Sequence, residues 1–202
     1  MQSLQFYKFL TILAIAFGFF FFTFQDKETF WYFYSFTILF LMGVSLLYAK
    51  VEDEVQTLEY LLLGVGYGTI TYFLFAASYW ILDSIPFLSV REIHQFLEQF
   101  GPNTIWHFML LFFIIAPAEE FFWRGFVQQY LKNYLPTFYA VVAASILFSI
   151  SLLVGGFVYG AIAGFIVGLL WGLLYEWKKS MPLLIVTHIT ALILLFLILP
   201  IL

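Results

Sequence analysis

Residues 104–131 read TIWHFMLLFFIIAPAEEFFWRGFVQQYL, an apolar stretch with three charged side chains in its second half. A transmembrane helix needs about 20 mostly apolar residues, so this stretch is long enough to span a bilayer. A charge at the bilayer centre costs roughly 2.5–3.5 kcal/mol or more. Because Glu119, Glu120 and Arg124 fall so close together inside it, we interpret them as a functional site within a membrane helix.

The composition of the whole chain also indicates a membrane protein. Of 202 residues, 64% are hydrophobic and 10% are charged, and the mean hydropathy is +1.00. Ordinary globular domains have roughly 25% charged residues, and a soluble chain this apolar lacks enough polar surface to cover its core. We therefore expect one membrane domain over 1–202. The net charge of −4 is small and scattered and indicates no nucleic-acid partner, and the absence of cysteine excludes disulfides and a cysteine nucleophile.

Working outward from 104–131, we expect an all-α, polytopic membrane bundle of about seven transmembrane helices. The expected spans are 4–24, 30–49, 58–82, 104–131, 136–153, 156–177 and 181–201. The less hydrophobic stretch 83–103 predicts a short amphipathic helix in the interface. In 156–177, glycines at every fourth position predict close helix packing, although small residues beside a cleft also leave room for a substrate chain. These glycines are Gly160, Gly164, Gly168 and Gly172.

The distribution of basic residues predicts the orientation. The N-terminal side and its matching loops hold Lys8, Lys50, Lys132, Lys178 and Lys179. The opposite side holds Lys27 and Arg91. Cytoplasmic loops carry an excess of Lys and Arg, so we expect a multi-pass protein of the cell membrane with a cytoplasmic N-terminus.

The charged residues of 104–131 predict two different environments. Arg124 follows Glu120 by four residues, so the two side chains share a helix face and predict a buried ion pair. Glu119 points about 100° away around the helix and lacks a local counter-charge, which suits a general base. His188 lies in the last span at a depth similar to that of Arg124, so we expect it to face the same site. The alternative is an ion network that only ties helices together, and it leaves Glu119 unexplained.

Three polar residues converging in this way do not predict a metal site. Zinc sites take three or four nitrogen, oxygen or sulfur ligands, and only two glutamates and one histidine are expected to meet here. We therefore expect no cofactor.

The same residues resemble a known family. The segment 119–125, EEFFWRG, resembles the Glu-Glu-x-x-x-Arg motif of the CPBP family of CAAX-protease and bacteriocin-processing membrane proteins, also called Abi proteins. The segment 168–176, GLLWGLLYE, is similar to the penultimate helix of that family, and His188 is similar to the histidine of its last motif. The resemblance covers a core of about 104–192. It implies a CAAX-protease-like fold and an intramembrane glutamic-type peptidase.

The resemblance also implies roles for the site residues. Glu119 would be the base that activates water, Glu120 and Arg124 would support the site, and His188 would stabilise the oxyanion or transfer a proton.

Two positions depart from the family pattern. Its middle motif, Phe-x-x-x-His, here begins at Phe148 and ends in Leu152, and its last Asn or Asp is Leu192. Leucine neither positions water nor donates a hydrogen bond. Removing one oxyanion donor typically lowers the rate about 10²–10³-fold. We expect Phe148, Ser149, Ser151 and Leu152 to line the cavity at the missing-histidine position.

The leading hypothesis is an intramembrane hydrolase that acts on an amide bond of a membrane-embedded peptide or lipopeptide, with Glu119 as general base. A first alternative, implied by one branch of the family, is the membrane component of a two-component lipoprotein N-acylation (acyltransferase) system. That branch belongs to the plasma membrane of Gram-positive bacteria and requires a protein partner. A second alternative is a catalytically inactive pseudoprotease scaffold. All three imply contact with membrane lipid and with a membrane peptide or lipoprotein.

Overall fold

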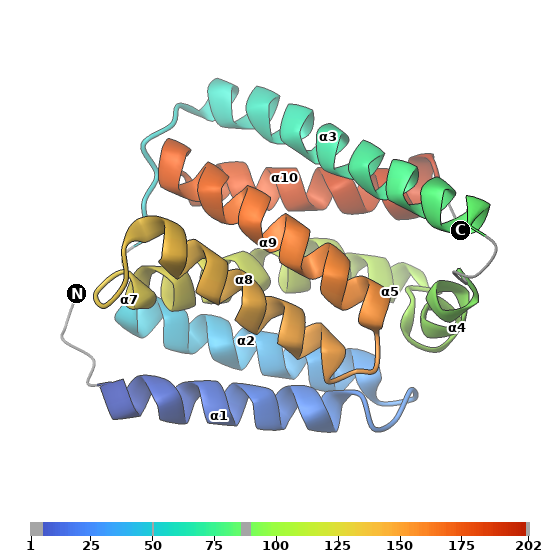
Figure 1. Cartoon of the computed structure of the whole chain (residues 1–202), viewed down its shortest axis with the longest axis horizontal. Helices are drawn as coiled ribbons and strands as arrows, with labels where there is room; N and C mark the ends of the chain where they lie inside the picture. The colour runs from blue at the N-terminus through green and yellow to red at the C-terminus, as the bar shows by residue number, and fades with distance from the viewer. Residues whose placement is uncertain (1–5, 50, 86–89, 201–202) are drawn as a thin grey trace.

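The computed structural model describes residues 6–49, 51–85 and 90–200, and the regular elements in these ranges are all helices. The α-helices are α1 (Phe6–Thr23), α2 (Phe30–Tyr48), α3 (Thr57–Ser84), α4 (Arg91–Phe100), α5 (Ile105–Leu110), α6 (Ala116–Glu120), α7 (Gln129–Leu131), α8 (Thr137–Leu153), α9 (Val158–Lys178) and α10 (Met181–Ile193). The π-helices are η1 (Leu111–Ile115), η2 (Phe121–Gln128) and η3 (Leu194–Ile198). The long helices run side by side as one bundle (Figure 1). The expected all-α architecture is confirmed.

Six helical segments are long and apolar enough to cross a membrane, which makes the chain a multi-pass membrane protein. They are Phe6–Thr23, Phe30–Tyr48, Thr57–Ser84, Ile105–Leu131, Val158–Lys178 and Met181–Ile198. The remaining expected span corresponds to α8, which has 17 residues. At 1.5 Å per residue α8 is about 26 Å long, near the lower limit for a spanning helix. Lys50, which contributes to the orientation argument, lies outside the described residues.

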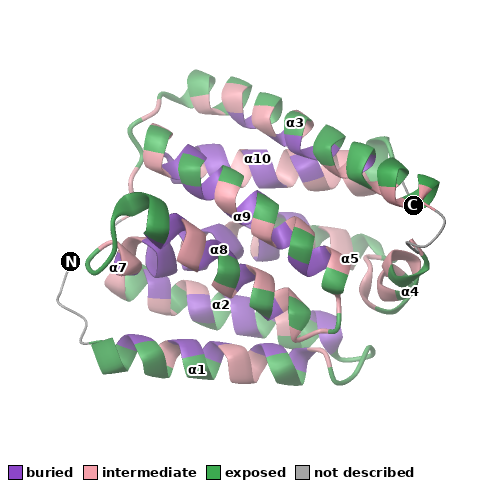
Figure 2. Cartoon of the chain, in the orientation of Figure 1, coloured by how far each residue is buried: buried purple, intermediate pink, exposed green. Residues whose placement is uncertain are grey.

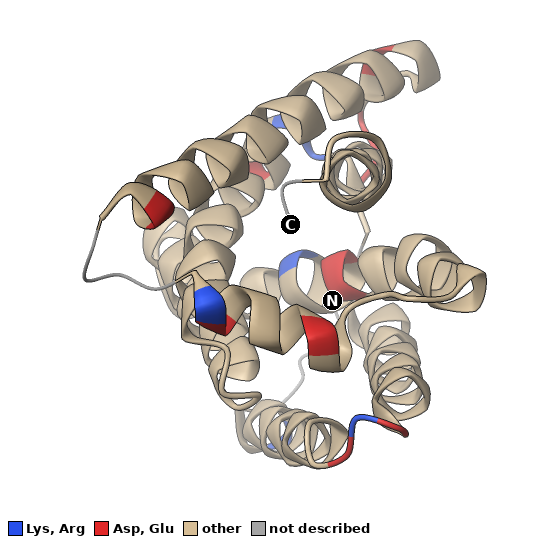
Figure 3. Ribbon diagram, turned by 90° about the vertical axis from the view of Figure 1, so that its right-hand side faces the viewer, with Lys and Arg blue, Asp and Glu red and all other residues tan. Residues whose placement is uncertain are grey.

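Exposed residues lie along the outer sides of the long helices (Figure 2), and many of them are large and apolar. Tyr32 and Leu47 are each 76% exposed and Phe113 is 71% exposed. Continuous apolar surface of this extent is rare on soluble monomers, and hydrocarbon is its natural surrounding. Charged residues are sparse along the helices (Figure 3). The surface therefore agrees with the membrane assignment.

The span Ile105–Leu131 is not a uniform α-helix, because π-helical turns lie on both sides of α6. Pro117, near the start of α6, has no N–H and cannot complete the α-helical ladder. A preceding π-turn such as η1 is one way in which a membrane helix accommodates proline. Single π-turns inside α-helices are frequent at functional sites. The sequence pattern did not reveal these turns, since apolar residues occupy every face.

The glycine-rich face of α9 packs directly against its neighbours. A Cβ atom at Gly168 would lie 2.8 Å from Cβ of Ser145, and one at Gly164 would lie 2.6 Å from Cδ1 of Leu152. Both distances are below van der Waals contact, so a side chain at Gly168 would clash with Ser145, and one at Gly164 would displace the end of the Leu152 side chain. The interpretation of close packing between α8 and α9 is confirmed.

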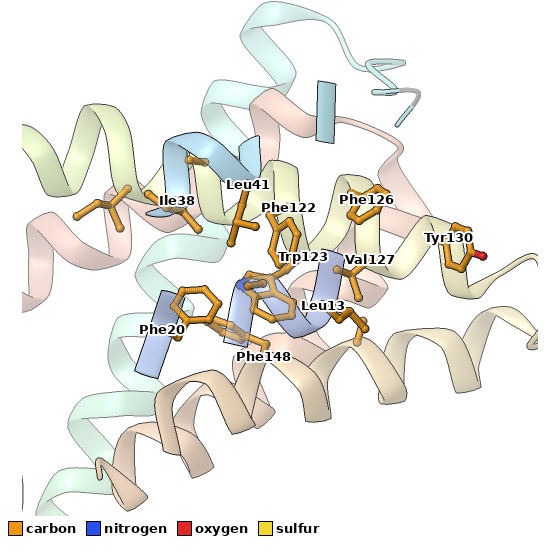
Figure 4. Packing of buried hydrophobic residues seen from close by; sticks show 14 of the residues in the cluster. Leu13, Phe20, Ile38, Leu41, Phe122, Trp123, Phe126, Val127, Tyr130 and Phe148 are labelled. Atoms are coloured by element: carbon orange, nitrogen blue, oxygen red, sulfur yellow. The ribbon is translucent and has the colours of Figure 1, made fainter. Parts of the chain in front are cut away.

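The first two helices are anchored to the site-bearing span by aromatic packing. Figure 4 shows Phe20 of α1 and Ile38 and Leu41 of α2 gathered around Phe122 and Trp123. The ring of Phe20 stacks on Trp123 with centroids 6.2 Å apart. The hairpin α1–α2 is therefore part of the same core as the charged helix.

The amphipathic helix expected in 83–103 is present as α4. Ile93 and Leu97 are partly buried, and the ring of Phe96 stacks on Phe157 with centroids 4.0 Å apart. Residues 86–89 of that stretch lie outside the described residues. The helix packs at one end of the bundle, opposite the end where α1 begins (Figure 1).

Candidate functional site

The structure brings Glu120, Arg124 and His188 together, and we call these three residues the buried cluster. Nη1 of Arg124 lies 3.1 Å from Oε1 and 3.0 Å from Oε2 of Glu120. Nδ1 of His188, on α10, lies 2.9 Å from Oε1 of Glu120. All three residues are at most 8% exposed. The ion pair predicted from the four-residue spacing is confirmed, and His188 joins it from the last span.

Aromatic rings enclose the buried cluster. The guanidinium carbon of Arg124 lies 5.0 Å from the ring centroid of Phe148 and 5.4 Å from that of Trp171. The rings of Trp171 and His188 are 4.6 Å apart. A cation over an aromatic face gains up to about 2 kcal/mol when desolvated. The rings therefore offset part of the cost of burying Arg124, whose Nη2 has no hydrogen-bond partner among the described residues.

Glu119 is in a different environment from its neighbour. It is 7% exposed, and its Oε1 accepts a hydrogen bond from the hydroxyl of Tyr34 on α2. Its Oε2 has no hydrogen-bond partner in the described part of the chain. As expected, no charged side chain of the described residues forms a hydrogen bond or an ion pair with Glu119. The tyrosine was missed because 85 residues separate it from Glu119 and no sequence pattern connects them.

The four residues expected at the missing-histidine position make separate contacts. Phe148 packs over Arg124, as described above. The hydroxyl of Ser149 donates to the carbonyl of Ala161 at 2.7 Å, and that of Ser151 donates to the carbonyl of Phe148 at 2.7 Å. Leu152 packs against the apolar core. Backbone carbonyls therefore accept the hydrogen bonds of both serine hydroxyls, and the expectation that all four residues line one cavity stays a prediction.

Two spaces within the bundle bear on access to the site. A narrow gap beside Arg124, too small to admit a water molecule, is lined by Trp123, Arg124, Gln128, Ala144, Ser145, Phe148 and Gly168. Of the four middle-motif residues, only Phe148 lines it. A larger, mostly apolar cavity of about 620 Å³ lies between α3 and α9, with α4 at one end. Neither Glu119 nor the buried cluster lines this larger cavity.

A second charged group lies near the ends of α7 and α9, and we call it the rim cluster. It consists of Gln128, Gln129, Lys132, Glu176 and Lys179. Oε1 of Glu176 accepts hydrogen bonds from the two glutamines at 2.9 Å and 2.7 Å, and Oε2 lies 2.6 Å from each lysine Nζ. Sequence spacing alone did not reveal it, because the helix ends meet only in the folded bundle.

The loop before α3 is attached to the turn between α9 and α10. Asp53 and Ser180 form an isolated β-bridge, and the Ser180 hydroxyl donates to Oδ1 of Asp53 at 2.8 Å. The amide of Glu54 donates to the carbonyl of Lys179 at 2.9 Å. This loop therefore closes over the same end of the bundle as the rim cluster.

Fold and site together define a multi-pass membrane protein with a buried cluster of glutamate, arginine and histidine. In the described ranges, no three His, Asp or Glu side chains are placed to hold a metal ion together. Residues 101–194 match the family model described as Rce1-like, type II CAAX prenyl endopeptidase Rce1-like. The match identifies an Rce1-like family domain over residues 101–194, which contains the motif in 119–125. No curated protein and no solved structure matched the chain.

Proposed function

We propose that the chain is an intramembrane enzyme that acts on an amide bond of a membrane-embedded peptide or lipopeptide, with Glu119 as general base. The observation that carries this proposal is the contrast between two adjacent carboxylates. Glu120 contacts a cation and an imidazole, whereas Glu119 receives one hydrogen bond from a neutral phenol. Pairs of carboxylates placed in such different environments are typical of acid–base sites. Membership of residues 101–194 in a protease family supports the reaction type.

In the proposed step, Oε2 of Glu119 takes a proton from water while the water oxygen bonds to the carbonyl carbon of the amide. The π electrons of the carbonyl move to its oxygen, and this oxyanion accepts a hydrogen bond from Nε2–H of His188. Because Nδ1–H of the same ring donates to Glu120, the proposed step uses the imidazolium form of His188. When the C–N bond breaks, the proton on Glu119 passes to the leaving amine. One water is consumed, and a carboxylic acid and an amine are formed.

His188 suits the oxyanion role because its ring is fixed in place. Nδ1 is hydrogen-bonded to Glu120, and the ring packs against Trp171. Nε2 has no hydrogen-bond partner among the described residues and is left for a substrate. In this proposal Glu120 and Arg124 orient the imidazole and balance its charge.

The proposal also includes an orientation. The described lysines Lys8, Lys132, Lys178 and Lys179 lie toward the end of the bundle where α1 begins and α9 ends. Lys27 and Arg91 lie toward the opposite end. By the excess of positive charge on the cytoplasmic side, the rim cluster faces the cytoplasm.

The test compares membrane peptides in cells that express wild-type protein, Glu119→Gln or no protein, by mass spectrometry. We expect peptides that disappear with wild type to persist with Glu119→Gln, because a general base typically contributes about 10²–10⁴ in rate. Glu59→Gln is the matched control, since it makes the same change at a half-exposed glutamate, and it should behave as wild type. Wild-type turnover by Glu119→Gln would overturn the proposal and favour a scaffold.

A further inference from the structure

We propose that Tyr34 is the positioning residue for Glu119, so that the active site includes a helix outside the family segment 101–194. This inference rests on the proposed function, because it assigns Tyr34 a role through the base. Tyr34 lies on α2, in the N-terminal hairpin that the family match does not cover. Its hydroxyl is the only hydrogen-bond partner of the Glu119 carboxylate in the described part of the chain.

The ring of Tyr34 is held firmly enough to position another group. It stacks on Phe30 with centroids 5.5 Å apart and an interplanar angle of 11°. It also contacts Phe20 and Phe24, with centroids 6.2 Å and 6.4 Å away. Phe20 in turn stacks on Trp123, four residues beyond Glu119. The donor and the carboxylate therefore belong to one packed unit.

The hydrogen bond fixes one oxygen of the carboxylate and leaves the other available. With Oε1 held by Tyr34, rotation of the carboxylate is restricted and Oε2 keeps one direction. A general base must reach the proton that it abstracts at about 2.6–3.2 Å. Catalysis is sensitive to such placement, since about 1 Å of misplacement can cost 10²-fold in rate. Tyr34 thus supplies orientation to the atom that is proposed to take the proton.

A phenol is well suited to this task beside a base. A cation in the same place would stabilise the negative charge and weaken the carboxylate as a proton acceptor. Tyr34 orients Glu119 without neutralising it. Leu152 has no polar atom with which to share this role.

The test measures steady-state kinetics of full-length Tyr34→Phe in lipid nanodiscs on a peptide identified with the wild type. We expect kcat to fall about 10- to 100-fold, the size of one hydrogen bond to a charged group, with KM unchanged. Tyr48→Phe is the matched control because Tyr48 lies on the same helix and its hydroxyl makes no hydrogen bond in the described residues. Equal kcat in the two variants would overturn the inference.

A double variant separates positioning from a merely structural role. If Tyr34 acts through Glu119, Tyr34→Phe should cause no further loss in a Glu119→Gln background, because residues that act as a unit are non-additive. A full additional loss would refute the inference while leaving the proposed base intact. An active Glu119→Gln single variant would instead refute the proposed function itself.

A third measurement covers the case in which Tyr34→Phe does not fold. Site-specific 3-fluorotyrosine at position 34 keeps the ring and its packing but makes the hydroxyl a stronger donor. A changed kcat with 3-fluorotyrosine at position 34 and not at position 48 would support the inference. An unchanged kcat at both positions would contradict it.

Discussion

The buried cluster and the rim cluster are both built around a glutamate, but the two carboxylates differ in their hydrogen-bond partners and in their exposure to solvent. Glu176 in the rim cluster accepts four hydrogen bonds, two to each oxygen, from residues near the ends of two spans. Glu120 in the buried cluster has one arginine nitrogen and one imidazole nitrogen, and aromatic rings surround them. The rim cluster is partly exposed, with Lys132 and Lys179 at 24% and 23% side-chain exposure.

The difference predicts in which cluster the removal of one charged side chain costs more stability. Charges near the surface interact through a high effective dielectric and retain contact with water, so each pair contributes little. In the buried cluster no water replaces a missing partner, so the loss of one member leaves a charge without compensation. We therefore expect the rim cluster to hold helix ends together and, in the proposed function, the buried cluster to hold the imidazole of His188 in place.

The ammonium of Lys179 illustrates the rim environment. Partial burial lowers the pKa of Lys179, but the hydrogen bond and charge of Glu176 raise it, and the net pKa lies above the ordinary value of 10.5. Because the pKa of Lys179 is raised in the folded state, the stability contributed by its ion pair with Glu176 is complete below the unfolded pKa. This contribution is lost only as the pH rises above about 10.5.

The largest expected effect on stability is from Arg124→Ala. Removing one partner of a buried ion pair typically lowers the free energy of unfolding by about 3–5 kcal/mol. Unfolding of the purified protein by denaturing detergent, followed by circular dichroism, measures this loss. The double variant Glu120→Ala with Arg124→Ala should lose less than the sum of the single variants, because the residues interact directly. Stability equal to wild type in both single variants would show that the pair has no structural role.

A smaller effect is expected from Glu176→Gln in the rim cluster. The amide keeps the shape but leaves Lys132 and Lys179 without their shared carboxylate oxygen. Losing hydrogen bonds to a charged group costs about 1–3 kcal/mol, and water near the helix ends compensates part of this. The same detergent titration applies. A loss greater than that of Arg124→Ala would break the distinction drawn between the two clusters.

The smallest effect is expected from Lys178→Cys. Its Nζ lies 3.0 Å from Oε1 of Glu59, but the two side chains are 21% and 50% exposed. Exposed pairs contribute about 0–1 kcal/mol, so unfolding should be almost unchanged.

The same variant reports the orientation, because the natural sequence has no cysteine. The new thiol should resist an impermeant reagent in intact cells and react after permeabilisation. Lys27→Cys, from the opposite end, should react in intact cells. The reverse pattern would place the rim cluster outside.

Much of the fold was predictable from the sequence. Runs of about 20 apolar residues specify spanning helices because a bilayer leaves no other partner for the backbone. The pairing of Glu120 with Arg124 was predictable as well, since a spacing of four residues puts both on one helix face. Both inferences use local spacing only.

The apolar runs alone identify this chain as a membrane bundle. They also predict that its charged helix carries a site, because burying charge in hydrocarbon is too costly to be incidental. Apart from the pair of Glu120 and Arg124, the partners of the two carboxylates follow from the tertiary structure and not from local spacing. Tyr34 reaches Glu119 and His188 reaches Glu120 from helices 85 and 68 residues away. Such contacts depend on how the helices rotate and pack against one another, and glycine faces and aromatic stacking set that packing across the whole bundle.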